Sequence, residues 1–280
     1  MAYDIHRIRN EFPSLAVTDN GKRRVYFDNP GGTQVAKRVM DRMQDYFIHM
    51  NTNGGGAFIT SQQSDALMDE GHAALADLVG SSDPGEIIFG QNMTTLTLHL
   101  SRSIGRTLSA GDEIVVTRMD HDANVSPWLL MAEDHGLKVR WMDFNPETFR
   151  YDQDALDRVL TPKTKLVAVN YASNATGTVN DIRSISRKAH EVGALVFVDA
   201  VQFTPHFVTD VKAIECDFLA CSAYKFYGPH QGLIWGKRDL LEAYTPYKVR
   251  PATNSLPGAY ETGTQSHEGM AGTLGAVEHF

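Results

Sequence analysis

Cysteine is scarce in this sequence. The 280 residues include two cysteines, Cys216 and Cys221. Two thiols do not make the framework of a disulfide-stabilised secreted scaffold, so a reducing cytoplasm is the expected compartment. Residues 1–12 are charged and contain no apolar core of a secretory signal, which favours the same location.

Long apolar runs and an excess of positive charge are also missing. The longest apolar stretches have the length of a strand, such as Leu195–Val198, whereas a membrane-spanning helix needs about 20 apolar residues. The chain has 26 Lys and Arg against 34 Asp and Glu, a formal net charge of -8. Binding to nucleic acid needs concentrated Lys and Arg. We therefore expect neither a membrane nor a nucleic acid as a partner.

Two groups of binding motifs are absent as well. The segment around His121 does not have the spacing of a metal site, and no HExxH sequence occurs, so no bound metal is expected. No GxGxxG sequence follows a strand, and there is no Walker-A lysine, which argues against a nucleotide-binding protein.

The sequence does contain an alternation of short apolar runs and helical patterns. The apolar runs predict buried strands at Glu86–Phe89, Glu113–Thr117, Lys138–Asp143, Leu166–Asn170, Leu195–Asp199, Phe218–Ser222 and Gly232–Trp235, with a short strand at Tyr26–Asn29. Helical spacing predicts helices at Ser64–Val79 with Ser64 as cap, Thr94–Leu108, Ser184–Val192 and Met270–Phe280. This alternation predicts an α/β fold with a largely parallel sheet, in which ligands bind beyond the carboxyl ends of the strands.

Polar side chains follow three of the predicted strands. Thr94 and Thr95 begin a helix, where free N–H groups and the helix dipole suit a phosphate; a simple N-cap at Thr94 is the alternative. His121 can serve as a base, a ligand or a stacking ring. Asn174 can donate a hydrogen bond to a ligand or act only as a turn residue.

Charged side chains follow two further strands. Asp199 ends an apolar strand, where an unpaired carboxylate is costly, so it implies a cationic partner such as a ligand. Lys225 lies among aromatic residues, which lower the pKa of an amine and suit Schiff-base chemistry. In this order, a phosphate site, a ring, an amide, a carboxylate and a lysine form the set that pyridoxal 5′-phosphate (PLP) needs.

This ordered set resembles the class V aminotransferase family of fold-type-I PLP enzymes, and within it cysteine desulfurases and selenocysteine lyases. The resemblance runs from Tyr26 to the end, on the anchors Tyr26-Phe27-Asp28-Asn29, Met93-Thr94-Thr95, Asp120-His121-Asp122-Ala123-Asn124, Ser173-Asn174-Ala175-Thr176-Gly177-Thr178, Val198-Asp199-Ala200-Val201-Gln202, Ser222-Ala223-Tyr224-Lys225 and Glu261-Thr262-Gly263-Thr264.

The family implies an arrangement of domains. Residues 26–265 would form the PLP-binding large domain, with a mostly parallel seven-stranded sheet flanked by helices, after an N-terminal segment at residues 1–25. Residues 266–280 would begin a helix that leads to a C-terminal small domain missing from this chain. In this family the small domain closes over the cofactor, so we expect slow turnover without it.

The resemblance also implies a role for each matched residue. Lys225 would form the Schiff base and move the α-proton of the substrate, and His121 would stack on the cofactor ring. The remaining cofactor contacts would be Asp199 to the pyridine nitrogen, Gln202 and Asn174 to the phenolic oxygen, Thr94, Thr95 and Ser222 to the phosphate, and Thr264 to the phosphate of a partner subunit. The last contact implies a homodimer.

The sequence departs from the desulfurase pattern in three features. Desulfurases carry His before the lysine, where this chain has Tyr224; molybdenum-cofactor sulfurases and kynureninases have Tyr there. No persulfide-forming cysteine is visible, because Cys216 and Cys221 adjoin or lie in a predicted strand and are interpreted as core thiols. That cysteine and the arginine for the substrate carboxylate would lie beyond Phe280.

The leading hypothesis is a PLP-dependent lyase or transferase that acts on a small amino acid. Cysteine desulfurase activity is the first expectation, with a protein that accepts the sulfur as a possible partner. Epimerisation, as in isopenicillin N epimerases, and C–C cleavage, as in kynureninases, stay open. A catalytically silent binding protein with the same fold is the alternative from another class.

Overall fold

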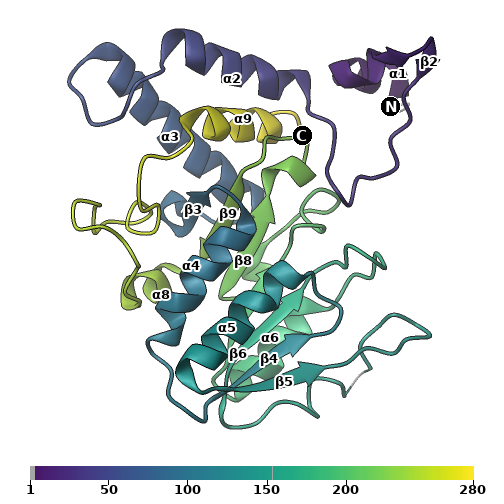
Figure 1. Cartoon of the computed structure of the whole chain (residues 1–280), viewed down its shortest axis with the longest axis vertical. Helices are drawn as coiled ribbons and strands as arrows, with labels where there is room; N and C mark the ends of the chain where they lie inside the picture. The colour runs from purple at the N-terminus through teal and green to yellow at the C-terminus, as the bar shows by residue number, and fades with distance from the viewer. Residues whose placement is uncertain (1–3, 153) are drawn as a thin grey trace.

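The computed structural model describes residues 4–152 and 154–280, and its centre is a seven-stranded sheet (Figure 1). The strands are β3 (Ile87–Gly90), β4 (Glu113–Thr117), β5 (Lys138–Met142), β6 (Thr164–Asn170), β7 (Leu195–Asp199), β8 (Phe218–Ser222) and β9 (Gly232–Gly236). The α-helices are α1 (Ile5–Asn10), α2 (Lys37–His49), α3 (Ile59–Leu78), α4 (Met93–Gly105), α5 (Ser126–His135), α6 (Ile182–Glu191), α7 (Val211–Ile214), α8 (Arg238–Ala243) and α9 (His267–Val277). A separate hairpin joins β1 (Thr18–Asp19) to β2 (Lys22–Arg23).

The sheet has the order β3-β9-β8-β7-β6-β4-β5. The pairs from β8 through β7, β6 and β4 to β5 are parallel, and only β9 runs antiparallel to its neighbours β3 and β8. The α/β fold, the seven strands and the mostly parallel sheet are thus confirmed.

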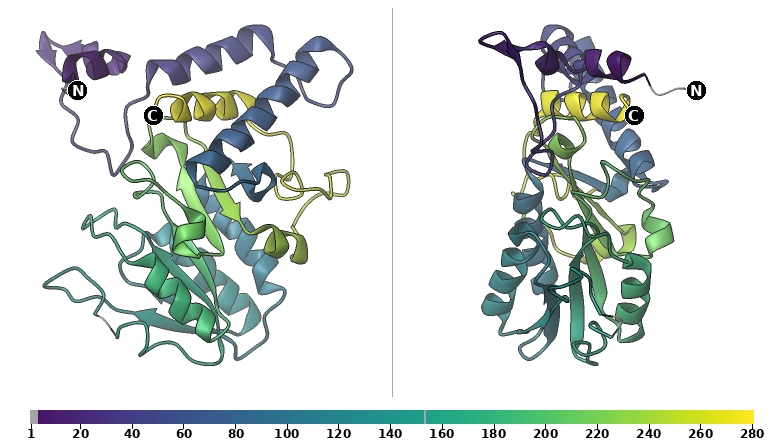
Figure 2. Two further views of the ribbon diagram at one scale, coloured as in Figure 1. Left: turned by 180° about the vertical axis from the view of Figure 1, so that it is seen from behind. Right: turned by 90° about the vertical axis from the view of Figure 1, so that its right-hand side faces the viewer.

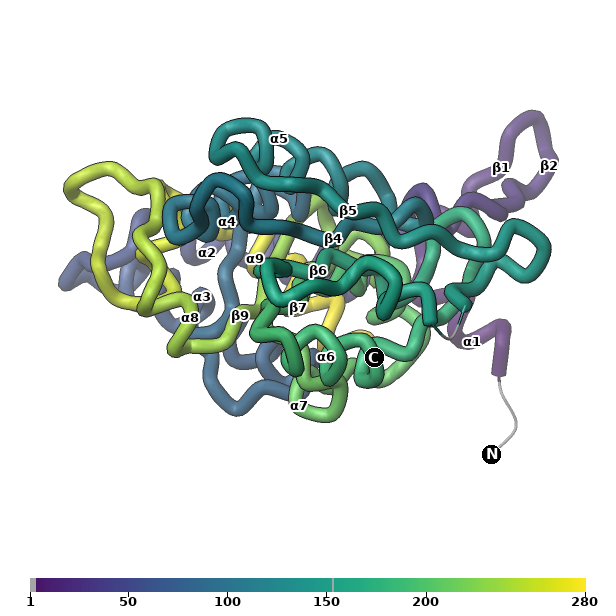
Figure 3. Tube along the Cα trace, turned by 90° about the horizontal axis from the view of Figure 1, so that it is seen from below, coloured from purple at the N-terminus to yellow at the C-terminus, as the bar shows by residue number. Residues whose placement is uncertain are grey.

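Alternating side chains of the strands pack into two hydrophobic cores, one on each face of the sheet. In β4, Val115 belongs to a core with residues of α3, α6, α7 and α9, whereas Ile114 and Val116 belong to one with residues of α4, α5 and α8. Figure 3 shows α4 and α5 on one side of the strands and α6 and α7 on the other, and the edge-on view in Figure 2 shows both layers. Burial on both faces explains why these strands appear in the sequence as continuous apolar runs.

The parallel register brings polar strand ends together at one edge of the sheet. Asn170 of β6 lies opposite Asp199 of β7, and Asp199 lies opposite Ala220 of β8. Lys225 follows β8 in a 3-10 turn, Ala223–Lys225. Three of the expected site segments therefore end side by side.

Some local expectations were wrong. Tyr26–Asn29 has no strand pairing, and the N-terminal strands are β1 and β2. Ser64 lies inside α3, which starts at Ile59, and its hydroxyl donates to the Thr52 carbonyl instead of capping a helix.

The N-terminal segment stands apart from the sheet, but Phe12 attaches it to the rest of the protein. In Figure 1, α1 and β2 lie in the upper right corner, α2 runs along the top, and α9 lies beneath α2 and packs against it. The ring of Phe12 contacts the rings of Tyr227 and His279, with centroids 5.3 and 5.1 Å away. No helix in the described residues is long and apolar enough to cross a membrane.

Candidate active site

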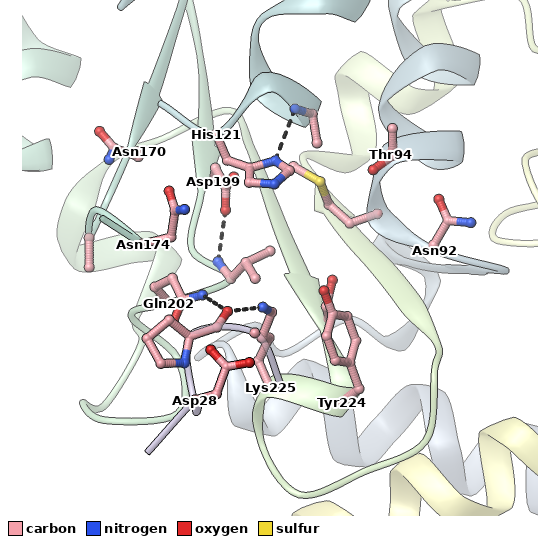
Figure 4. A pocket seen from close by; sticks show the side chains of 17 residues that line it. Asp28, Asn92, Thr94, His121, Asn170, Asn174, Asp199, Gln202, Tyr224 and Lys225 are labelled. Carbon is pink, nitrogen blue, oxygen red and sulfur yellow. Dashed lines mark hydrogen bonds between the residues drawn. The ribbon is translucent and has the colours of Figure 1, made fainter. Parts of the chain in front are cut away.

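A cavity of about 490 Å³ lies beyond the carboxyl ends of β6, β7 and β8, next to the start of α4. Most of the residues expected to form the site line it together: Thr94, His121, Asn174, Asp199, Gln202, Ser222 and Lys225. Figure 4 labels all of these except Ser222 and shows the labelled side chains converging from separate elements. Thr95 and Thr264 lie outside it and line a neighbouring cavity.

Lys225 is a buried amine held by two contacts. Its Nζ donates a hydrogen bond to the Pro30 carbonyl and lies 4.7 Å from the centroid of the Tyr224 ring. Burial lowers the pKa of Lys225, against the charges of Asp199 and Asp28, which raise it. The lowered pKa increases the share of neutral, nucleophilic amine relative to an exposed lysine, in the direction that the sequence indicated.

Asp199 is a buried carboxylate at the end of β7. One of its oxygens accepts a hydrogen bond from the Val201 N–H at 2.9 Å, and among the described residues it forms no ion pair. Burial raises the pKa of Asp199 to about 6, although Val201, His121 and Lys225 act in the opposite direction. A cation placed against this carboxylate would be strongly favoured.

His121 lies beside Asp199, at the start of a short 3-10 turn, Asp122–Asn124 (Figure 4). Its Nδ1 accepts a hydrogen bond from the Ala123 N–H at 3.1 Å, so this nitrogen carries no proton. The contact fixes the imidazole in the wall of the cavity, where it can serve as a stacking ring.

The start of α4 forms another wall. Asn92 caps the helix, because its side-chain oxygen accepts hydrogen bonds from the N–H and the hydroxyl of Thr95 at 2.8 and 2.9 Å. Asn92, rather than Thr94, is therefore the cap, which leaves the Thr94 side chain directed into the cavity (Figure 4). The positive end of this helix suits an anionic group.

A glycine makes this wall possible. A β-carbon on Gly232 of β9 would collide with the backbone of Asn92 and Met93. The strand and the helix start can lie so close only because residue 232 has no side chain.

Gln202 and Asn174 reach the cavity from loops after β7 and β6 (Figure 4). The Gln202 side-chain amide donates to the Pro30 carbonyl at 2.9 Å, the same oxygen that accepts from Lys225. Both side chains offer amide groups to a ligand oxygen.

The sequence interpretation missed the contribution of the N-terminal turn. Asp28, Pro30 and Gly31 line the cavity, and the Thr33 N–H and hydroxyl both donate to the Tyr224 carbonyl, at 3.0 and 2.9 Å. The Tyr26–Asn29 anchor was a signal for this segment, but its contact with Lys225 joins residues too far apart in sequence to predict.

Asp120 is a second, half-buried carboxylate, directly before His121. It accepts hydrogen bonds from the Thr117 hydroxyl, the Asn124 amide at 2.6 Å and the Asn170 N–H at 3.0 Å. Burial, with a contribution from Asp199, raises the pKa of Asp120 to about 8 despite these donors. Asp120 thereby ties the loop that carries His121 to the end of β6.

Both thiols are part of the core. Cys216 and Cys221 are free and buried, and burial raises the pKa of each, to about 12 for Cys221. Neither lines the cavity, so the interpretation as core thiols is confirmed. Within residues 4–152 and 154–280, no group of three or more His, Cys, Asp or Glu side chains could hold a metal ion.

Comparison with known proteins gives a consistent family. The family model "Aminotransferase class-V" matches residues 25–279. The chain is 36% identical over 245 residues to the aminotransferase-like protein FGM3 of Gibberella zeae, covering 85% of this chain and 58% of that protein. It is 35% identical over 249 residues to a cysteine desulfurase of Dickeya dadantii, covering 88% of this chain and 60% of that enzyme.

Solved structures agree with this result. The chain superposes on the cysteine desulfurase CsdA of Escherichia coli with a TM-score of 0.88 and 29% identity, covering 99% of this chain and 72% of that one. It shares the fold of a cysteine desulfurase from Thermococcus onnurineus NA1, with a TM-score of 0.90, 24% identity and coverage of 99% and 71%. The chain thus spans 58 to 72% of the length of these proteins.

Proposed function

Because the chain belongs to the aminotransferase class-V family, we propose that it is a PLP-dependent enzyme that acts on a small amino acid with cysteine desulfurase-like chemistry. The main observation behind this proposal is that Asp199 and Lys225 line the same cavity. Asp199 is buried without an ion pair among the described residues, and a protonated pyridine ring is a cation of suitable shape for it. The residues present therefore fit the cofactor.

When bound, PLP supplies an aldehyde that joins to amines as a Schiff base and a ring that accepts the electron pair of the α-carbon. Lys225 is the amine that we assign to this attachment. Its lowered pKa makes it more nucleophilic than an exposed lysine, and the same amine would take the α-proton of the substrate.

Two residues prepare the position of the ring. Asp199 would hold a proton on the pyridine nitrogen, because a buried carboxylate strongly favours a nearby positive charge. His121 would stack on the ring, and its hydrogen bond from Ala123 keeps the imidazole in place.

The oxygens of the cofactor have separate partners. We assign Gln202 and Asn174 to the phenolic oxygen and Thr94 and Ser222 to the phosphate, at the start of α4. Thr95 supports the phosphate wall through Asn92, since its N–H and hydroxyl are both used there.

We assign Thr264 to a phosphate contact across a dimer interface. It lines the neighbouring cavity instead of the one with Lys225, so its expected phosphate contact would be with a partner subunit. We therefore propose a homodimer and, from the scarcity of cysteine, a cytoplasmic location.

Cysteine is the first candidate substrate, because relatives with this fold are cysteine desulfurases. Such a reaction would pass sulfur to an acceptor protein. Tyr224, in place of the His of desulfurases, favours a kynureninase-like C–C lyase as a second candidate, and an epimerase stays open as a third. Burial and Asp199 raise the pKa of Tyr224, so its hydroxyl stays protonated as a hydrogen-bond donor.

The test is a titration of the cofactor-free protein with PLP, followed by visible absorption. The proposal predicts a saturable band for the wild-type protein and for Lys212→Ala, which removes a lysine outside the cavity. Lys225→Ala should lack the band. A wild-type protein that stays colourless would contradict the proposal and favour a binding protein without catalytic activity.

A further inference from the structure

Outside the cavity, the molecule contains a buried histidine–carboxylate pair. His72 lies in α3, and Glu261 begins the segment that precedes α9; their side chains are 9% and 11% exposed. The Nε2 of His72 is 2.8 Å from Oε1 of Glu261. Exposed pairs of this kind contribute little, but a pair this buried is protected from solvent screening.

Both ring nitrogens of His72 face hydrogen-bond acceptors. Nδ1 lies 2.7 Å from the Met68 carbonyl, which can only accept, so Nδ1 carries a proton. Oε1 of Glu261 already accepts from the Phe89 N–H at 2.8 Å, and it accepts the Nε2 proton as well. All partners are satisfied when His72 is an imidazolium and Glu261 a carboxylate.

The surroundings support this charge state. Burial opposes the charge, but the hydrogen bond and the charge of Glu261 outweigh it, aided by Met68 and Asp69, so the pKa of His72 is raised. On the other side, the ring of Phe89 in β3 lies perpendicular to the imidazole, with ring centroids 4.9 Å apart. The backbone N–H of Phe89 donates a hydrogen bond to Glu261.

The pair connects α3, β3 and the segment before α9 next to the candidate active site. Phe89 lies in β3, directly before the turn with Asn92 and Thr94 that walls the candidate active site. The Gln265 side chain donates to the Glu261 carbonyl at 2.7 Å, which holds the segment 261–265 in a compact form. This segment and the start of α4 line the neighbouring cavity together.

We propose that His72 and Glu261 are a positioning pair that holds the segment 261–265 and the start of α4 in register, so that PLP binds more weakly when His72 loses its proton. This inference rests on the proposed function, because the bound phosphate is what the start of α4 would recognise. According to this inference, the protonation of His72 changes the affinity for PLP although His72 does not line the candidate active site.

The sign of the pH effect follows from the raised pKa. The stabilisation from the pair is fully present below the pKa of an unfolded histidine, about 6.5, and is lost as the pH rises through the pKa of folded His72. The PLP affinity of the wild-type protein should therefore fall with rising pH more than the cofactor chemistry alone requires.

The experiment measures the dissociation constant of PLP for cofactor-free protein from about pH 6 to pH 9, for wild type, His72→Gln and Glu261→Gln. The matched control is His49→Gln, an exposed histidine near Asp45 on α2. In wild type and control, the constant at the upper pH should exceed that at the lower by about fivefold or more. In both pair variants the binding should be weaker and this ratio at least halved. If one variant does not fold, the other decides.

A second readout needs no cofactor. The thermal midpoint of the cofactor-free wild-type protein should fall as His72 deprotonates, and the two pair variants should lack this step. Equal pH ratios in all four proteins would overturn the inference while the proposed function stands, even if the variants are less stable. Failure of wild type to bind PLP at any pH would overturn the proposed function and the inference together.

Discussion

Gly32 lies against the ring of Tyr224, and a β-carbon on residue 32 would be 3.2 Å from Cδ2 of that ring. The same turn donates hydrogen bonds from Thr33 to the Tyr224 carbonyl, directly before Lys225. The missing side chain at residue 32 therefore leaves room for the aromatic ring that precedes the lysine. The absence of a side chain at residue 32 and the large ring at residue 224 are thus complementary in size.

Gly32→Ala should force the Tyr224 ring, next to Lys225 in the sequence, to shift by a few tenths of an ångström. We expect a loss of about 1–3 kcal/mol in the free energy of unfolding, measured by denaturant titration, and weaker PLP binding. In a Tyr224→Ala background the alanine has room, so the same substitution should cost clearly less. Equal costs in both backgrounds would show that the contact does not matter.

Gly232→Ala tests the approach of β9 to the start of α4. Its β-carbon would collide with the backbone of Asn92 and Met93, which cannot move aside as a flexible side chain can. We expect a loss of about 3 kcal/mol or more in unfolding free energy, and the loss of PLP binding in an absorbance titration.

The contrasting glycine is Gly71, in the middle of α3. A β-carbon there would meet its nearest neighbour, Cζ of Phe89, at an ordinary 3.8 Å. Gly71→Ala should therefore raise the unfolding free energy by about 0.5–1 kcal/mol, because alanine is the better helix former. Destabilisation by this substitution would mean that α3 and β3 lie closer than described.

Asp199→Asn should have opposite effects on stability and on cofactor binding. The raised pKa means that folding penalises the ionised carboxylate, so the wild-type protein without cofactor loses stability as the pH rises from about 4 to 6. Asparagine escapes this penalty, and the variant should become more stable than wild type by about 2 kcal/mol at pH 7. It should bind PLP at least tenfold more weakly. Thermal unfolding across this pH range and a PLP titration check both parts; a stability difference independent of pH would contradict the first.

Asp120→Ala should destabilise the loop that carries His121. The Thr117 hydroxyl, the Asn124 amide and the Asn170 N–H would each lose a partly buried acceptor, so we expect a loss of about 2–3 kcal/mol in unfolding free energy. The control is Asp122→Ala, whose carboxylate is exposed and bonds Ser126; it should cost about 1 kcal/mol or less. Similar losses in the two variants would argue against a special role for Asp120.

The sequence predicted the sheet and most of one side of the cavity. Strands buried on both faces, such as Leu195–Asp199, are continuous apolar runs, and the polar residue after each run is visible in the sequence. Since parallel strands end at one edge, the convergence of Asn174, Asp199 and Lys225 followed from the strand pattern.

The contacts between distant segments could not be predicted in this way. The Pro30 carbonyl meets Lys225 and Gln202, and Glu261 meets His72, across long stretches of chain that leave no periodic signal. The starts of two helices were predicted wrongly for a local reason, because several polar residues near a helix start are able to cap it. Ser64 and Thr94 looked suitable, but α3 starts earlier and Asn92 provides the cap of α4.

Borohydride reduction of the PLP-treated protein, followed by peptide mass analysis, tests the central assignment most directly. Reduction makes a Schiff base permanent, so the account predicts one modified peptide, with the pyridoxyl phosphate mass on Lys225 and none on Lys212 or Lys237. A modification spread over surface lysines, or absent from the Lys225 peptide, would contradict the account.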